Sequence, residues 1–132
     1  FVKRVVDSLS ANQYCEISSD QYNNPTYTDD LVQAVSKIIE FKKQGIFHIG
    51  GGEQISNYSF AQKIVDVFNL DSNYLRPVLT KDLSLTARYP LTSGLVIIKS
   101  QTELGYKPYT INEALSLIKK EFYLWKYFFS YY

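Results

Sequence analysis

The sequence has 132 residues, 45% of them hydrophobic and 16% aromatic, which is enough to bury the core of one domain. Its formal net charge is +1, from 14 basic and 13 acidic residues, so charge gives no reason to expect a nucleic-acid or anionic-membrane partner. The single cysteine, Cys15, excludes an internal disulfide and is typical of a reducing compartment, so we expect a cytoplasmic protein.

Membrane and secretion signals are not visible in the sequence. No stretch approaches the roughly 18 consecutive apolar residues of a membrane-spanning helix, and the start lacks the apolar run of a signal peptide. The chain contains no methionine and starts at Phe1, which is too large for the usual removal of an initiator methionine. We therefore expect a piece of a longer polypeptide, with part of any chemistry in the missing portion.

The first quarter of the chain is predicted to form a helix, a strand and a loop. Apolar residues recur at helical spacing over residues 1–12, and residues 14–18 are a short strand candidate. Residues 20–27 are predicted to be a loop, because Asn24 precedes Pro25 and proline disfavours a helical conformation in the residue before it.

A second helix is expected to begin with Thr28 as its cap, because a hydroxyl there can accept a free backbone N–H of the first turn. Asp29 and Asp30 suit the positive end of its dipole, and Gly45 is expected to stop it. Its buried stripe is predicted to be Leu31, Ala34, Val35, Ile38 and Ile39.

The centre of the chain, residues 45–69, is predicted to be a strand, a glycine turn and a helix. Apolar residues at 45–49 suit a buried strand, three glycines at 50–52 end it, and Ser56 can cap the helix. A dinucleotide-binding turn would need glycines at its first, third and sixth positions, and the sixth position is Ile55. We interpret the turn as a strand-to-helix connection at a sheet edge.

The following segment is less regular. Residues 74–79 are predicted to be an extended sheet-edge segment, and residues 80–93 are irregular. Ser100 and Glu103 match a capping box that would open a short helix, which Gly105 would close.

The chain is predicted to end in a long helix. Thr110 and Glu113 match a second capping box that would start it. Residues 121–132 contain eight aromatic residues, and we expect an aromatic helical extension that covers either the missing N-terminal part or a second copy of the chain. A membrane-surface role is disfavoured, because Lys126 is the only basic residue among these aromatics.

Several local patterns follow one another in a specific order. They are DQYNNPTYTDDL at 20–31, GIFHIGG at 45–51, Ser56 with Phe60 and Ala61, ARYPLTSGL at 87–95, Lys99 with LGYKP at 104–108, and EAL at 113–115. In this order they resemble the C-terminal part of the RmlD-like, dTDP-4-dehydrorhamnose reductase-type branch of the extended short-chain dehydrogenase/reductases. The resemblance covers residues 1–120, and the tail at 121–132 matches nothing we can name.

The resemblance implies an α/β fold, namely the C-terminal portion of a Rossmann-type enzyme with a sheet-edge strand at 45–49 and a small α/β substrate-binding lobe. A missing N-terminal Rossmann domain would bind NADPH or NADH, and this portion would close over a dTDP- or UDP-linked sugar. Such enzymes reduce a 4-keto sugar by hydride transfer, and epimerases or dehydratases of the same type are close alternatives. A homodimer is a further expectation that the resemblance leaves open.

The catalytic set of this family is absent. None of the 12 tyrosines is followed four residues later by lysine, and the N-terminal glycine-rich cofactor turn is missing. We therefore expect no catalytic and no cofactor-binding residue in this chain, and no activity from it alone. The Arg-Pro of the family pattern is replaced by Tyr89-Pro90, although Arg88 stands one position earlier.

Six residues are candidates for contact with the nucleotide sugar. Arg76 and Arg88 are candidates for the diphosphate, because guanidinium groups match phosphate oxygens, and the alternative is a surface arginine or a structural salt bridge. The candidates for the sugar or base pocket are Thr26, Tyr27, Tyr89 and Ser93, with simple packing as the alternative.

The only histidine, His48, is interpreted as structural, because it lies in the expected strand without a carboxylate at a suggestive spacing. Cys15 is expected to be an inert, partly buried thiol. No residues have the spacing of metal ligands.

Two other classes of function remain open at this point. The first is a non-catalytic regulatory or interaction subunit on the same scaffold, like the regulatory subunit of methionine adenosyltransferase, and the aromatic tail motivates it. The second is a stand-alone binding module. The strand expected at 45–49 argues against a module, because alone it would expose unpaired N–H and C=O groups.

Overall fold

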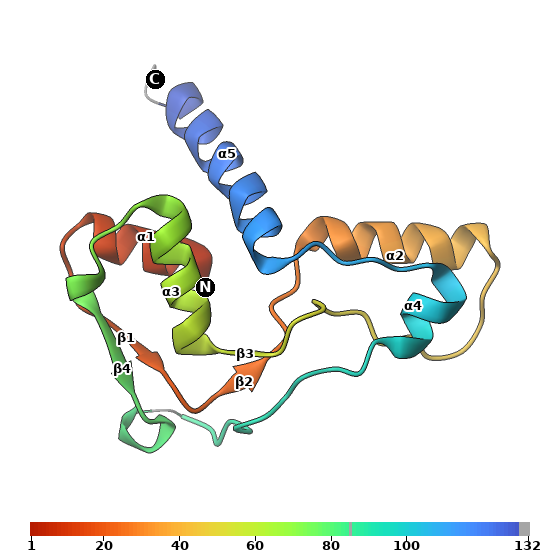
Figure 1. Cartoon of the computed structure of the whole chain (residues 1–132), viewed down its shortest axis with the longest axis horizontal. Helices are drawn as coiled ribbons and strands as arrows, with labels where there is room; N and C mark the ends of the chain where they lie inside the picture. Colours follow the sequence, from red (N-terminus) through yellow and green to blue (C-terminus); the bar gives the residue numbers. More distant parts are fainter. Residues whose placement is uncertain (85, 130–132) are drawn as a thin grey trace.

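The computed structural model describes residues 1–84 and 86–129. The fold is α/β, with helices around two small sheets (Figure 1). The elements in chain order are α1 (Val2–Ser10), β1 (Cys15–Ser18), β2 (Tyr22–Asn23), α2 (Thr28–Glu40), β3 (Ile55–Ser56), α3 (Asn57–Phe68), β4 (Leu75–Val78), α4 (Ile98–Leu104) and α5 (Ile111–Phe129). Short 3-10 turns, η1 (Ser72–Tyr74) and η2 (Thr80–Asp82), flank β4.

The two sheets have two strands each. β1 and β4 are parallel, with Cys15 opposite Leu75, so α3 lies in the crossover between them. β2 and β3 are antiparallel, with Tyr22 opposite Ser56, and a bridge from Tyr22 to Thr92 adds a further segment beside β2. The strands predicted at 14–18 and 74–79 are thereby confirmed as β1 and β4.

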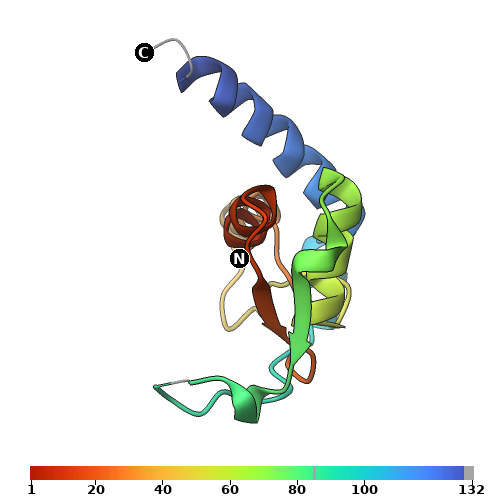
Figure 2. The same ribbon diagram turned by 90° about the vertical axis from the view of Figure 1, so that its left-hand side faces the viewer.

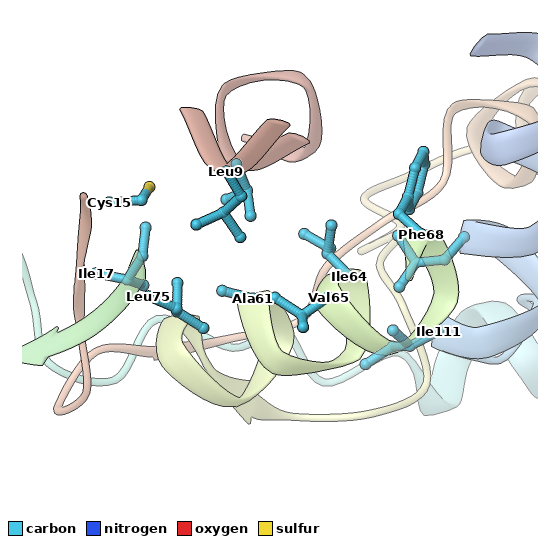
Figure 3. Packing of buried hydrophobic residues seen from close by; sticks show 11 residues of the cluster. Leu9, Cys15, Ile17, Ala61, Ile64, Val65, Phe68, Leu75 and Ile111 are labelled. Atoms are coloured by element: carbon cyan, nitrogen blue, oxygen red, sulfur yellow. The ribbon is translucent and has the colours of Figure 1, made fainter. Parts of the chain in front are cut away.

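The main core lies between α1, α3 and the β1–β4 sheet, and α5 covers one end of it (Figure 3). Leu9 of α1 and Ile64 of α3 are almost fully buried and point into the same interior from opposite sides. Leu115 of α5 is 1% exposed and closes this core. Burial of each such side chain is worth about 1.5–3 kcal/mol, so this cluster holds the fold together.

A second, smaller core lies between α2 and α4. Its buried members are Ala34, Ile97, Leu104 and Tyr106, and the half-buried Phe47 and Ile49 pack against them. The tyrosine hydroxyl donates a hydrogen bond of 2.9 Å to the carbonyl of Gly50, which joins this core to the glycine turn. Beyond both cores, α5 projects away from the rest of the chain (Figures 1 and 2).

The structure corrects the predicted buried stripe of α2. Only Ala34 is buried and Ile38 is half-buried, whereas Leu31, Val35 and Ile39 are 41%, 52% and 72% exposed. The reason is that no element of the described chain packs on that side of α2. The helix also ends at Glu40, before Gly45, because Lys42 already adopts a left-handed conformation with a φ of 48°.

The segment expected to be a strand at 45–49 belongs to no helix or strand. Among the described residues, no other segment pairs with it, and a strand requires such a partner. Its side chains nevertheless alternate, since Phe47 and Ile49 are half-buried while Ile46 and His48 are exposed. This alternation is typical of a β-strand, and its membership of a larger sheet stays a prediction.

The predicted helix caps have mixed outcomes. Ser56 caps α3 by accepting the N–H of Ser59 at 3.0 Å, and Thr110 and Glu113 form the predicted capping box of α5. The capping box at Ser100 is wrong, because α4 already begins at Ile98. Thr28 is the first residue of α2 and not its cap. Gly105 ends α4 in the left-handed conformation, as expected.

Candidate functional site

A pocket of about 620 Å³ lies at the centre of the chain, and we call it the central pocket. The first turns of α1, α2, α3 and α5 all contribute to its walls, together with the loop between β2 and α2. Two of the six predicted ligand-contacting residues, Thr26 and Tyr27, line it. It is therefore the best candidate for a binding site in the described part of the chain.

The loop that carries Thr26 is held against the glycine turn. The Thr26 hydroxyl accepts the Gly51 N–H at 3.1 Å and donates to the Asn24 carbonyl at 3.0 Å. The Asn24 amide donates to the Gly51 carbonyl at 3.0 Å. A Cβ on Gly51 would lie only 2.0 Å from the Pro25 carbonyl oxygen, so glycine is required here by close approach.

These contacts bear on the prediction that the glycine turn is not a dinucleotide site, which stays a prediction. A phosphate-binding turn offers free backbone N–H groups to its ligand. Here the N–H and the carbonyl of Gly51 are bound by Thr26 and Asn24, and the Gly50 carbonyl is bound by Tyr106. The turn joins two parts of the chain.

Tyr27 links the pocket to α5. Its hydroxyl donates a hydrogen bond of 3.2 Å to the Glu121 carboxylate, and its ring meets that of Tyr109 edge-on with 6.0 Å between centroids. Burial raises the pKa of Tyr27 to about 12, and hydrogen bonding and charge from Asp29 and Glu121 add to this. The Tyr27 phenol is therefore protonated near pH 7, and its O–H group remains a hydrogen-bond donor.

Amide side chains form another part of the wall. The Asn23 amide donates to the side-chain oxygen of Asn57 at 2.7 Å. The Asn57 amide in turn donates to the hydroxyl of Ser18 at 2.8 Å and to the side-chain oxygen of Gln21 at 3.0 Å. This network fixes the orientation of both asparagines, which line the pocket. Both amide N–H groups of Asn57 are used within the network, whereas the Asn23 amide has a second N–H that can donate to a ligand.

The electrostatics of the pocket combine opposing contributions. The N-terminal ends of four helices carry partial positive charge, and neither α1 nor α2 has a side-chain cap. The carboxylates of Asp29 and Glu121 oppose this charge, and no lysine or arginine is among the described residues that line the pocket. A highly charged diphosphate would therefore need a cation from outside the pocket.

The other four predicted contact residues lie elsewhere. Arg76 is exposed on β4, and its guanidinium lies 3.6 Å from the ring centroid of Tyr14. Arg88 and Tyr89 lie in an exposed segment, and Ser93 is exposed beside β2, where its N–H donates to the Tyr22 carbonyl at 3.0 Å. The structure does not bring these residues to the central pocket, and their contact with a ligand stays a prediction.

Sequence reasoning missed the other residues that line the pocket, among them the polar residues Asn23, Asn57 and Glu121. Asn57 follows the helix cap Ser56 directly, and that position beside a predicted turn was the one signal available. Glu121 carried no such signal, because its partner Tyr27 is 94 residues away in the sequence.

The remaining single-residue predictions concern possible reactive groups. Cys15 is buried and free, as expected of an inert thiol. His48 is exposed, and its carbonyl accepts the Ser100 hydroxyl at 2.6 Å. In the described ranges, no group of three or more histidine, cysteine or acidic side chains is placed to hold a metal ion. None of the described helices is both long enough and apolar enough to span a membrane.

Comparison with known proteins gives a consistent result. Residues 1–124 match the RmlD substrate binding domain. The dTDP-4-dehydrorhamnose reductase of Aggregatibacter actinomycetemcomitans is 30% identical over 134 residues, a match that covers 90% of this chain and 44% of that protein. Methionine adenosyltransferase 2 subunit beta of Xenopus laevis is 31% identical over 83 residues, covering 59% of this chain and 25% of the relative.

The structural comparison agrees with the sequence comparison. A crystal structure of dTDP-4-dehydrorhamnose reductase from Bacillus anthracis, in complex with NADP, superposes with a TM-score of 0.82 at 25% identity. The match covers 92% of this chain and 43% of the reductase. The chain thus spans less than half the length of the relatives it matches.

Proposed function

The chain belongs to the RmlD substrate binding domain family, and from this premise we propose that it is the nucleotide-sugar-binding part of an NAD(P)-dependent sugar-nucleotide oxidoreductase. Its scaffold is that of dTDP-4-dehydrorhamnose reductases. The proposed reaction of the whole protein is the reduction of a 4-keto sugar carried on dTDP or UDP. The observation that carries the proposal is the match over 92% of the chain to a reductase solved with NADP, in a chain whose described part contains a suitable pocket.

The central pocket supplies binding and orientation. The Tyr27 hydroxyl oxygen, whose proton is donated to Glu121, can accept a hydrogen bond from a hydroxyl of a sugar or base, and the second N–H of the Asn23 amide can donate one to its oxygens. The half-buried Phe60 in the same wall offers an apolar surface for a ring. In this proposal these groups place the reacting carbon and help to exclude water from it.

The chemical step would be completed by the rest of the polypeptide. A bound nicotinamide cofactor would supply the hydride, and a Tyr-x-x-x-Lys pair would deliver the proton. This chain contains no such pair, and its only run of glycines has Gly51 bound by Thr26 and Asn24. Its role in catalysis is therefore to hold the substrate against a cofactor bound elsewhere.

Exposed apolar side chains on α2, in the segment at 45–49 and at the start of α4 support a cofactor-binding part in the same polypeptide. Ile39 and Ile46 are 72% and 78% exposed, and Val96 and Ile98 are 71% and 64% exposed. Apolar surface of this extent usually marks an interface. The alternating segment at 45–49 also has the side-chain pattern of a strand that would complete a larger sheet.

The test is titration of the full-length protein, loaded with NADPH or NADH, with dTDP- and UDP-linked sugars by calorimetry. Tyr27→Phe, which removes one hydroxyl from the pocket wall, should weaken binding about tenfold, as loss of one well-used hydrogen bond does. Tyr123→Phe makes the same change on α5 outside the pocket and serves as the matched control. No binding of any nucleotide sugar, or equal affinity in both variants, would count against the proposal.

A second candidate function is a regulatory subunit, and the similarity to methionine adenosyltransferase 2 subunit beta favours it. Helix α5 runs to Phe129, past the end of the family match at residue 124, and its Tyr123 and Leu124 side chains are 50% and 60% exposed. Size-exclusion chromatography of the full-length protein with purified methionine adenosyltransferase tests this candidate. Co-elution that is lost when residues 121–132 are removed supports it, and separate elution of the two proteins argues against it.

A further inference from the structure

Two side chains of the β1–β2 region hold the two ends of one exposed loop. The first is Asp20, at the end of β1. Its Oδ1 accepts the Thr80 N–H at 2.9 Å and the Thr80 hydroxyl at 2.6 Å, and its Oδ2 lies 3.2 Å from the same N–H. Next to it, the Ser19 N–H donates to the Val78 carbonyl at 2.9 Å. Thr80 is thus firmly fixed at the point where the chain leaves β4.

The second side chain is Asn24, which holds the other end of the loop. Its Oδ1 accepts the Leu95 N–H at 2.7 Å, while its amide holds the glycine turn. A Cβ on Gly94 would lie 2.6 Å from this Oδ1 and 2.7 Å from the Gln54 amide nitrogen. The loop end therefore packs tightly on Asn24, which explains a glycine at position 94.

Backbone hydrogen bonds add to this second attachment. The Tyr22 N–H donates to the Leu91 carbonyl at 2.7 Å, and the Ser93 N–H donates to the Tyr22 carbonyl at 3.0 Å. Figure 1 shows the segment after η2 passing beneath β2 on its way to α4. Both ends of the loop are thus tied to residues 19–24.

The part between the two attachments carries a cation and an aromatic ring. Residues 86–91 are all exposed, and among them are Arg88 and Tyr89, the latter 59% exposed. Among the described residues, no carboxylate forms an ion pair with Arg88. The central pocket lacks a lysine or arginine, and Asn24 stands between two residues that line it, Asn23 and Pro25. The loop therefore attaches next to a pocket that needs an external cation.

We propose that Asp20 and Asn24 are positioning residues, which hold this loop at both ends so that Arg88 meets the diphosphate of the nucleotide sugar. The proposal rests on the nucleotide-sugar function proposed above. Tying both ends of a loop removes much of the conformational freedom that the loop would otherwise lose on binding. A guanidinium held in this way can bind phosphate oxygens at lower entropic cost.

The test uses the full-length protein with its cofactor and a bound dTDP- or UDP-sugar. Asn24→Ala should raise the Kd and the KM about tenfold and leave kcat within about twofold, because the loop would contact the ligand without touching the reacting carbon. Arg88→Ala should have an effect of similar size. The decisive result is the double variant, which should bind no more weakly than Arg88→Ala alone, because Asn24 acts through Arg88.

Asn24→Ala also loses the hydrogen bond to Gly51. If it folds poorly for that reason, a second pair of variants tests the same proposal. Thr80→Val removes the hydroxyl held by Asp20 at nearly constant shape, whereas Thr80→Ser retains it. Measured at a temperature well below both thermal midpoints, where both variants are fully folded, Thr80→Val should weaken binding about three- to tenfold and Thr80→Ser should bind like the wild type. Weaker binding by folded Thr80→Val than by folded Thr80→Ser would support a positioning role, because a purely structural role would change the thermal midpoint and leave the affinity of the folded protein the same.

The outcomes separate the two proposals. If the wild-type protein binds no nucleotide sugar, the proposed function fails and this inference fails with it. If the wild type binds but Asn24→Ala and Thr80→Val bind equally well, only the positioning role is overturned. Strictly additive losses for Asn24→Ala and Arg88→Ala would also overturn it, because the two residues would then act independently.

Discussion

Tyr27 and Glu121 are 94 residues apart in the sequence and share a hydrogen bond of 3.2 Å. Tyr27 stands at the start of α2, on the wall of the central pocket, and Glu121 lies in the outer half of α5. Helix α5 is also held by the buried Leu115, by Phe122, which packs edge-on against Phe68, and by Lys119, whose ammonium donates to the Val67 carbonyl at 2.7 Å. The hydrogen bond therefore connects the projecting helix to the pocket.

The first prediction concerns the strength of this connection. Tyr27→Phe should lower the free energy of unfolding by about 0.5–1.5 kcal/mol, the usual net contribution of one hydrogen bond. Urea unfolding followed by circular dichroism measures it. Glu121→Gln retains an acceptor and should cost less than Tyr27→Phe. Equal stability of wild type and Tyr27→Phe would show that α5 does not depend on this contact.

The second prediction concerns alkaline pH. Burial raises the pKa of both Tyr27 and Tyr106 to about 12, and for Tyr106 the charge of Asp30 adds to the effect. Folding therefore favours the protonated phenols. The stability they contribute is fully present below the ordinary tyrosine pKa of about 10 and is lost as the pH rises towards 12.

Thermal unfolding between pH 9 and pH 11.5 checks this prediction. The midpoint of the wild type should fall over this range more steeply than that of the double variant Tyr27→Phe/Tyr106→Phe. Tyr123→Phe, in which an exposed phenol is removed, should follow the wild type. Parallel curves for the wild type and the double variant would contradict the prediction.

The third prediction concerns the glycine turn. An added Cβ on Gly51 would lie 2.0 Å from the Pro25 carbonyl oxygen, which is a backbone atom that has little room to move. Gly51→Ala should therefore destabilise the fold by about 1–3 kcal/mol, as overpacking does. Gly52→Ala is the matched control, because its Cβ would meet only the Pro108 side chain at 3.5 Å. Equal unfolding midpoints for the two variants would refute the close approach.

Local sequence patterns predicted some of these contacts and missed others. The helix caps at Ser56 and Thr110 were predictable, because the side chain and its backbone partner lie within three residues of each other. The β1 strand was predicted as a short strand candidate at 14–18, and β4 as an extended segment at 74–79 that contains Pro77. For the caps the chemistry is local, so the sequence contains all of it, whereas the pairing of β1 with β4 joins residues about 60 positions apart.

Sequence patterns did not predict the surroundings of a side chain whose contact partner is distant in the sequence. Ser100 has the spacing of a helix cap, but it is fully buried inside α4, where its hydroxyl donates to the His48 carbonyl 52 residues away. Arg76 stacks on Tyr14 through the strand pairing of β1 with β4, a contact that the sequence did not reveal, and its contact with phosphate stays a prediction. The apolar residues of α2 were expected to be buried, and what would cover them is not in the described chain.

The fourth prediction concerns acid stability. The hydrogen bond from the Thr80 hydroxyl lowers the pKa of Asp20, with a smaller contribution from the Thr80 N–H. Folding therefore favours the ionised carboxylate. The stability it contributes is present above the ordinary aspartate pKa of about 3.9 and is lost as the pH falls below it.

Unfolding midpoints between pH 6 and pH 2.5 check this fourth prediction. Asp20→Asn should lower the midpoint at pH 6 and should make the decline with acid shallower than in the wild type. Asp71→Asn makes the same change on an exposed aspartate whose Oδ1 accepts the Asn73 N–H beside it, and it is the control. Identical slopes for Asp20→Asn and the wild type would show that Asp20 is not perturbed by Thr80.

The fifth prediction concerns the exposed side of α2. The 132-residue chain on its own should self-associate, because Val35, Ile39 and Ile46 present apolar surface of 52%, 72% and 78% exposure beside a segment with unpaired strand character. Ile39→Lys combined with Ile46→Lys should shift the chain towards monomer in sedimentation velocity. Because both side chains are exposed, the thermal midpoint should change by little more than 2 °C.

The control for this last prediction is Leu9→Ala in the main core, where the side chain is 2% exposed. It should lower the thermal midpoint strongly, since removal of a buried leucine costs about 2–5 kcal/mol, and it should not relieve association. In the longer polypeptide proposed above, the lysine variants should instead be harmful, because charge would then enter the proposed interface with the cofactor-binding part. A monodisperse wild-type chain at high concentration would show that the exposed side of α2 needs no cover.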